Sequence, residues 1–298
     1  MELLVKPVAP FTTRHWRRAY SSFQDSSFFW NGEEILIGIG SPPRAGVIRI
    51  QEKGVPGNPL LKIKWQGAFK KEEVYHIVSH VLSIYEPVTL FYQKFDKDPV
   101  MRNLIKEFSG TRMPRTRSFF EALVTTVLEQ QVSMKAASTL RERFIKKFSS
   151  RKSLFEGREL YAFPLPEEVA TSSVEELCQI GISRAKARTI LNFARVLKES
   201  TLDPHSLSKE NPQSIISFLT TFSGIGRWSA QFIVTRWLGP PDVFACSDLG
   251  VRKALSKFYL NGKMPTPLES EQFMERFSPW RRLAGFYLLL AYTGGDKA

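Results

Sequence analysis

The sequence predicts a mostly α-helical protein that begins with an α+β domain, in which an antiparallel sheet is followed by an all-helical part. Short apolar segments separated by Gly and Pro fill the first hundred residues, as is typical of strands. After residue 117, apolar residues recur at helical spacing along almost all of the remaining chain. The boundary falls within 96–116, and we divide the chain into domains 1–105 and 106–298.

The first domain contains three strand-like segments and one helix. The segments 35–40, 46–50 and 60–65 are apolar, and the last two alternate apolar with polar or basic residues. This alternation indicates an antiparallel sheet with one face covered and the other toward solvent. Apolar residues at helical spacing within 71–85 predict a helix that covers the apolar face.

The second domain is a succession of helical patterns that follows the basic segment RMPRTR. Ser133 is well placed to cap the second of these helices. The predicted helices span 118–130, 133–148, 173–179, 184–199, 212–220, 227–238, 249–259, 269–277 and 281–292.

The composition indicates a globular protein with an anionic partner. Apolar residues make up 43% of the 298 residues, and Lys plus Arg exceed Asp plus Glu by 42 to 29, which gives a net charge of +13. Such a bias favours nucleic acid over a membrane surface as the partner. No apolar run approaches the ~20 residues needed to span a bilayer, and the N-terminus lacks a signal-peptide core. We expect an intracellular monomer with no membrane partner.

Metal and cluster sites have little support in the sequence. The two cysteines, Cys178 and Cys246, are too few for a cysteine-ligated iron–sulfur cluster or a four-cysteine zinc site. His76 and His80 share a predicted helix face, but two ligands do not make a metal site, and a solvated or packing role is the simpler interpretation. We therefore expect no metal and no cofactor.

The stretch FSGIGRW joins two predicted helices through Gly224 and Gly226. Glycine permits a tight turn, and the helix that begins near Arg227 leaves backbone amides without internal partners. These amides suit a phosphate and would bind DNA without reading its sequence. The simpler interpretation is a helix turn in which glycine serves geometry alone.

In combination, these motifs resemble the helix-hairpin-helix (HhH-GPD) superfamily of DNA glycosylases, in particular the 3-methyladenine DNA glycosylase II branch. The resemblance covers about residues 99–293, and the sheet-like N-terminal part matches more weakly. The stretches that carry it, in chain order, are LEQQVSMKAA, GIGRWSAQF, PDVFACSDLGVRKAL and SPWR. It implies excision of alkylated purines from double-stranded DNA without a cofactor, leaving an abasic site. It also implies that four hairpin residues contact the DNA: Gly224, Gly226, Arg227 and Ser229.

The resemblance places the catalytic carboxylate on Asp248. This residue precedes LGVRKALSKF and is also a good helix N-cap, worth ~1 kcal/mol, so both roles can hold. Unpaired amides and the helix dipole favour a charged carboxylate there. Cleavage of the glycosidic bond builds positive charge on the sugar, which a fixed anion stabilises while it orients or deprotonates a water.

The resemblance also assigns a base pocket and a gap-filling side chain. It places Trp228, Phe232 and Trp280 around the flipped base, where aromatic rings favour cationic alkylated purines, although such residues in isolation are usually core residues. Gln131 would fill the gap left by the flipped nucleotide, with a polar loop residue as the alternative. Either Arg281 or Arg282 could approach the DNA or the pocket.

One absence separates the branches of this family. Bifunctional relatives carry a lysine nucleophile in the helix before the hairpin, whereas that helix here, PQSIISFLTTF, contains none. We therefore expect a monofunctional glycosylase of base excision repair. Two other functions stay open at this point: a non-catalytic DNA-binding protein, and a bifunctional glycosylase/lyase for oxidised bases.

Overall fold

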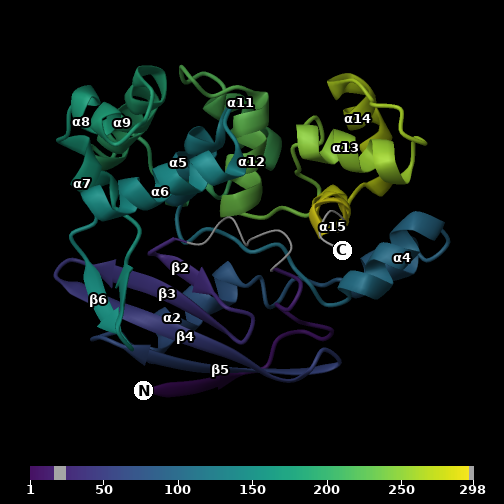
Figure 1. The fold of residues 1–298 in the computed structure, drawn as a ribbon, viewed down its shortest axis with the longest axis horizontal. Coiled ribbons are helices and arrows are strands. Elements are labelled where there is room, and N and C mark those ends of the chain that lie inside the picture. The colour runs from purple at the N-terminus through teal and green to yellow at the C-terminus, as the bar shows by residue number, and fades with distance from the viewer. Residues whose placement is uncertain (17–24, 295–298) are drawn as a thin grey trace.

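The computed structural model describes residues 1–16 and 25–294, and its N-terminal layer is a five-stranded antiparallel sheet (Figure 1). The strand order across the sheet is β1-β5-β4-β3-β2. The strands are β1 (Glu2–Val5), β2 (Phe28–Trp30), β3 (Glu34–Ser41), β4 (Arg44–Val55) and β5 (Asn58–Gln66). The predicted antiparallel sheet is confirmed.

The register of the sheet gathers isoleucines on one face. Ile37 lies opposite Ile48, and Ile50 lies opposite Ile63. Since side chains alternate between the two faces of a strand, Ile48 and Ile50, two residues apart, point to the same face. Helix α2 (Lys71–Val81) covers this face with valine side chains that are fully buried. The predicted helix is confirmed and ends at Val81.

A short hairpin packs on the opposite face of the sheet and was not predicted from the sequence. It consists of β6 (Lys152–Phe155) and β7 (Arg158–Tyr161), and its buried Leu160 joins Leu36 and Val47 in a small apolar cluster. The expectation that this face is turned wholly to solvent is therefore wrong. The Glu156-Gly157 turn, with φ of 48° and 79°, is the two-residue type that joins adjacent strands.

The middle of the chain forms a helical group with its own hydrophobic core. Its apolar side chains lie within residues 119–243. The helices are α5 (Phe119–Glu129), α6 (Met134–Phe148), α7 (Pro166–Ala170), α8 (Val174–Gln179), α9 (Arg184–Lys198), α10 (Pro204–Leu207), α11 (Pro212–Leu219) and α12 (Arg227–Trp237).

The last helices return to the N-terminal layer and share its core. Fully buried Tyr287 packs edge-on against Phe91, and its hydroxyl lies 2.8 Å from that of Tyr92. The last helices share a hydrophobic core with the N-terminal layer although they are far from it in the sequence. The division into domains 1–105 and 106–298 therefore stays a prediction. The helices of this group are α3 (Thr89–Lys94), α4 (Pro99–Phe108), α13 (Leu249–Phe258), α14 (Pro267–Met274), the 3₁₀ turn η1 (Glu275–Phe277) and α15 (Arg281–Gly294).

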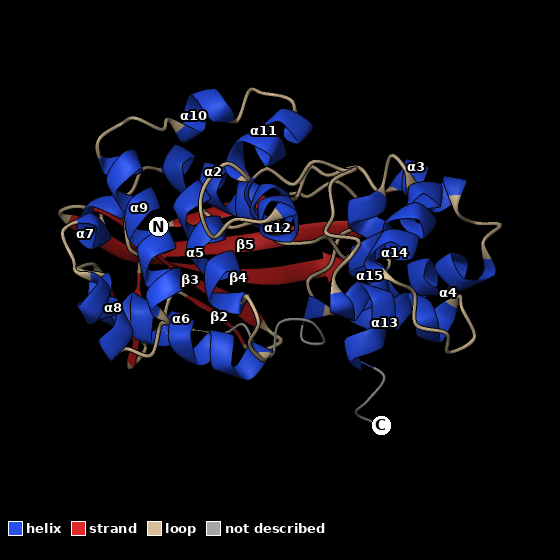
Figure 2. Cartoon of the chain, turned by 90° about the horizontal axis from the view of Figure 1, so that it is seen from above, coloured by secondary structure: helices blue, strands red, loops and turns tan. Residues whose placement is uncertain are grey.

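Helix α12 lies where the two helical groups meet (Figure 2). Its Ile233 and Val234 pack into the core of the middle group, whereas Phe232 on another face contacts Phe244 of the second core. Within residues 1–16 and 25–294, no helix combines the length and apolar character that crossing a bilayer requires.

Candidate nucleic-acid interface and active site

The two glycines of the α11–α12 turn have different structural roles. Gly224 has φ +87°, and a Cβ there would lie 2.2 Å from Thr189 Oγ1, so the fold itself requires glycine. Gly226 is the N-cap of α12 with φ −86°, and nothing lies within 4 Å of a Cβ built on it. The second glycine thus keeps the surface open beside the first amides of α12, where an anion can approach.

The other two hairpin residues differ in exposure. Arg227 is exposed, and its nearest carboxylate is 3.9 Å away on Glu271, so its charge is available to a ligand. Ser229 is only 3% exposed, and its hydroxyl accepts a 2.9 Å hydrogen bond from Gln130. The structure thus places Ser229 beneath the surface that Arg227 and Gly226 form.

Asp248 is held from two sides. As N-cap of α13 its Oδ1 accepts a 2.8 Å hydrogen bond from the amide of Gly250, while its Oδ2 accepts a 3.0 Å bond from the indole Nε1–H of Trp228. The side chain is half-buried. The capping role is therefore present, and a tryptophan of the hairpin helix fixes the carboxylate as well.

The aromatic residues of α12 form a supported pair. The ring of half-buried Trp228 lies 4.7 Å from that of buried Phe232, edge to face. Behind Phe232, the guanidinium of Arg236 sits 4.8 Å from the ring centre and forms a 2.6 Å ion pair with Glu129 of α5. This backing holds Phe232 in place, so Trp228 is the member of the pair that a bound molecule can reach.

Trp280 precedes α15 and is half-buried. Its ring packs edge-on at 6.3 Å from Phe95, against the core shared with the sheet. The structure therefore links Trp228 to both Phe232 and Asp248 through direct contacts, whereas the ring contact of Trp280 is with Phe95.

The turn between α5 and α6 lies against the hairpin. Gln131 is exposed and adopts a left-handed backbone with φ +54°. The preceding residue, Gln130, donates side-chain hydrogen bonds of 2.9 Å to the carbonyl of Gly224 and to Ser229. Sequence reasoning overlooked Gln130, and the only signal for it was the doubled glutamine in QQVS.

The two arginines at the start of α15 occupy different environments. Arg282 is fully buried and binds the carboxylate of Glu86 at 2.7 Å and the carbonyl of Met113 at 2.9 Å. It joins the start of α15 to the N-terminal layer and is inaccessible to DNA. Arg281 is half-buried and pairs with Asp242 at 2.8 Å.

The two histidines of α2 do not form a site together. His76 is exposed with its ring against Tyr75, whereas a ring nitrogen of His80 lies 3.0 Å from the carbonyl of Thr116. Burial lowers the pKa of His80. Across the parts of the chain that the structure describes, His, Cys, Asp and Glu side chains form no group of three that could hold a metal ion.

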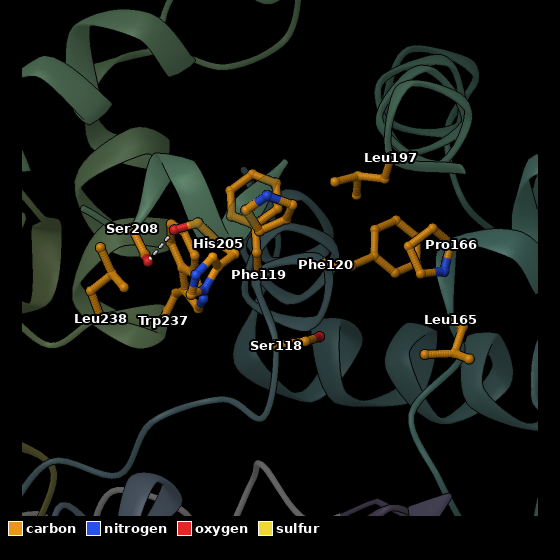
Figure 3. Close-up of a pocket in the computed structure, with 11 residues that line it drawn as sticks. Ser118, Phe119, Phe120, Leu165, Pro166, Leu197, His205, Ser208, Trp237 and Leu238 are labelled. Atoms are coloured by element: carbon orange, nitrogen blue, oxygen red, sulfur yellow. Dashed lines mark hydrogen bonds between the residues drawn. The ribbon is translucent and has the colours of Figure 1, made fainter. Parts of the chain in front are cut away.

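An apolar cavity of about 380 Å³ lies near the C-terminal end of α12 (Figure 3). The rings of Phe119, Phe120 and Trp237 line it. Trp237 is nine residues from Trp228, or about 14 Å along a helix with a rise of 1.5 Å per residue. The cavity is therefore separate from the carboxylate.

The family follows from a comparison with known sequences. A sequence model of the HhH-GPD superfamily base excision DNA repair proteins matches residues 124–279, which is more than half of the chain. The chain belongs to this family. The HhH-GPD match begins within α5 and includes the Gln130–Gln131 turn, the glycine hairpin and Asp248.

Individual HhH-GPD relatives agree with the match. The chain is 26% identical over 220 residues to the DNA-3-methyladenine glycosylase of Bacillus subtilis. The alignment covers 74% of this chain and 72% of the relative. The structure of a 3-methyladenine DNA-glycosylase from Archaeoglobus fulgidus superposes with a TM-score of 0.82 at 25% identity, over 97% and 98% of the two chains. The 8-oxoguanine glycosylase/lyase of Clostridium acetobutylicum has the same fold, with a TM-score of 0.77 at 17% identity over 97% and 95%.

Proposed function

We propose that this HhH-GPD protein is a monofunctional DNA glycosylase that excises alkylated purines of the 3-methyladenine type from double-stranded DNA and leaves an abasic site. The hydrogen bond between Trp228 and Asp248 is the observation that carries the proposal, because it joins a fixed carboxylate to an accessible aromatic ring. The names of the Bacillus subtilis and Archaeoglobus fulgidus relatives support the substrate class.

Asp248 supplies the negative charge for the reaction. As the glycosidic bond lengthens, positive charge develops on the deoxyribose, and a preorganised carboxylate stabilises it without having to reorganise. The same carboxylate can orient a water and accept its proton as the water attacks the sugar. Trp228 and the amide of Gly250 hold the two oxygens in different directions, which keeps the group in one orientation.

The ring of Trp228, supported from behind by Phe232, supplies affinity for the base. An alkylated purine carries positive charge, and the face of an indole attracts such a cation by about 2 kcal/mol in a desolvated site. Trp280 would contribute from the opposite helical group. An alkylated purine is also a better leaving group than a neutral one, so a pocket with few specific donors can still select damaged bases.

The remaining residues hold the DNA. The amides that follow Gly226 and the side chain of Arg227 would bind backbone phosphates, and Gln131 would fill the gap left by the flipped nucleotide. One chain supplies the hairpin, the carboxylate and the aromatic rings, which supports a monomer as the active form. The proposed DNA substrate supports an action inside the cell. Base flipping then presents the purine to Trp228 and the sugar to Asp248.

A direct assay tests this function and its mechanistic branch. The protein is incubated with methylated duplex DNA, and released bases are separated by chromatography. We expect free 3-methyladenine, with strand breaks only after hot alkali. Borohydride should trap no covalent complex, because neither α11 nor α12, the two helices of the hairpin, carries a lysine to form a Schiff base.

Each alternative function gives a different result in this assay. Efficient borohydride trapping would identify a glycosylase/lyase. Tight binding to DNA with no released base would identify a non-catalytic DNA-binding protein.

A further inference from the structure

One side chain connects the two turns that the proposed function places against DNA. Nε2 of Gln130, at the end of α5, lies 2.9 Å from the carbonyl oxygen of Gly224 and 2.9 Å from the hydroxyl of Ser229. Its neighbour Gln131 is the exposed residue of the first turn. The glycine hairpin and the Gln131 turn are therefore joined by hydrogen bonds from a single amide.

Helix α9 braces both turns from below. The ammonium of Lys186 donates to the carbonyls of Leu128 at 2.9 Å and of Gln130 at 2.7 Å, which fixes the end of α5. One turn further along α9, the hydroxyl of Thr189 donates to the carbonyl of Ser223 at 3.2 Å. Residues three apart lie on one helix face, so a single face of α9 holds both turns.

The backbone of Gln131 requires such support. Its φ of +54° is left-handed, a conformation that is unfavourable for a residue with a side chain and persists only where neighbours impose it. The bonds made by Gln130 and Lys186 are the contacts that impose it here.

We propose that Gln130 is a positioning residue that couples the Gln131 turn to the hairpin, so that DNA held by the hairpin meets Gln131 already aimed at the gap. The inference rests on the proposed function and adds to it. Gln130 lies beneath the DNA-facing residues and acts through Gln131 and not on the base.

The substitution Gln130→Met tests the coupling because methionine has a similar length but no donor. We expect single-turnover excision from duplex DNA to fall about tenfold, the effect of losing roughly one net hydrogen bond. Affinity for undamaged duplex should change less than about threefold, since the hairpin amides are untouched. Gln213→Met, the same change at an exposed glutamine of α11, is the matched control and should leave both values unchanged.

A double-mutant cycle shows whether Gln130 acts through Gln131. If it does, the variant carrying both Gln130→Met and Gln131→Ala excises no more slowly than Gln131→Ala alone. If the double variant instead loses excision rate by the product of the two single-variant factors, the proposal is overturned. An equal loss of excision and of undamaged-duplex affinity would also overturn it, because that result indicates a general loss of folding.

The coupling can be tested separately from the excision activity. The same variants are measured for binding to duplex DNA that contains a tetrahydrofuran abasic analogue, which presents a gap without any base to excise. Gln130→Met should reduce the preference for this duplex over intact duplex about tenfold. If the preference is unchanged in Gln130→Met, the proposed coupling is wrong even if the variant still excises bases. If the wild-type protein excises nothing, only the proposed function is wrong.

Discussion

The indole of Trp228 and the carboxylate of Asp248 form a 3.0 Å hydrogen bond between residues 20 apart in the sequence. Trp228 belongs to α12, which packs into the core of the middle helical group, and Asp248 caps α13, whose apolar side chains belong to the core shared with the N-terminal sheet. The orientation of the proposed catalytic group thus depends on how the two cores meet.

Replacing Asp248 by asparagine should separate capping from catalysis. Asparagine caps a helix about as well as aspartate, so the free energy of unfolding should fall by at most about 1 kcal/mol. The neutral amide cannot stabilise a cationic sugar or accept a proton, and it keeps only one acceptor for two donors. We expect excision to fall on the order of 10² or more, measured in single turnover. Near-normal excision would remove Asp248 from the mechanism.

Replacing Trp228 by phenylalanine should remove the bond to Asp248 while keeping an aromatic face. The carboxylate keeps its charge and its bond from Gly250 but loses the donor that fixes Oδ2. We expect an excision rate about tenfold lower, the scale of a hydrogen bond to a charged group. Trp280→Phe is the comparison, since it keeps a ring and leaves the bond to Asp248 intact. Equal losses in the two variants would contradict a special role for the indole N–H.

The two hairpin glycines should respond differently to alanine. Gly224→Ala places a Cβ at 2.2 Å from Thr189 Oγ1 on a backbone with φ +87°, so thermal stability and DNA binding should both fall. Gly226→Ala meets open space at φ −86° and should change the free energy of unfolding by about 1 kcal/mol or less. DNA affinity should still fall about tenfold, because the methyl group stands where a phosphate approaches the amides. Unchanged affinity in Gly226→Ala would place the phosphate elsewhere.

Affinity for undamaged duplex DNA should depend steeply on salt. The net charge of +13 implies that binding releases counterions from the DNA. Titrations at about 50 and about 200 mM salt should differ at least about tenfold in Kd. A nearly constant Kd would show that the basic surface is not the DNA footprint.

The two thiols should differ in reactivity toward a thiol reagent. Burial raises the pKa of Cys246 to about 12, so its thiol stays neutral and unreactive at any ordinary pH, whereas Cys178 is half-buried. Titration with a disulfide reagent at about pH 8 should find one fast thiol in the folded protein and two after denaturation. Fast reaction of both thiols in the folded state would show that the Asp248 segment opens readily.

Local sequence patterns were sufficient for most of the helices and for the hairpin. Apolar spacing and a capping serine predicted a helix over 133–148, and α6 spans 134–148, while Gly226 marked the beginning of α12. These features depend on neighbouring residues, so they can be read along the chain. The β6–β7 hairpin was missed because four-residue strands carry too little alternation to stand out.

The sequence by itself determined the residue types of the candidate site: a carboxylate at a helix start, aromatic residues four apart, and a glycine turn rich in free amides. Only the tertiary structure decided which of two neighbouring arginines is buried, that Ser229 lies beneath the surface, and that Gln130 joins two turns. The physical reason is that burial and hydrogen-bond partners depend on how helices distant in the sequence pack. Trp228 and Asp248 meet because the helix that carries Trp228 and the helix that Asp248 caps are fixed by two separate cores that adjoin there.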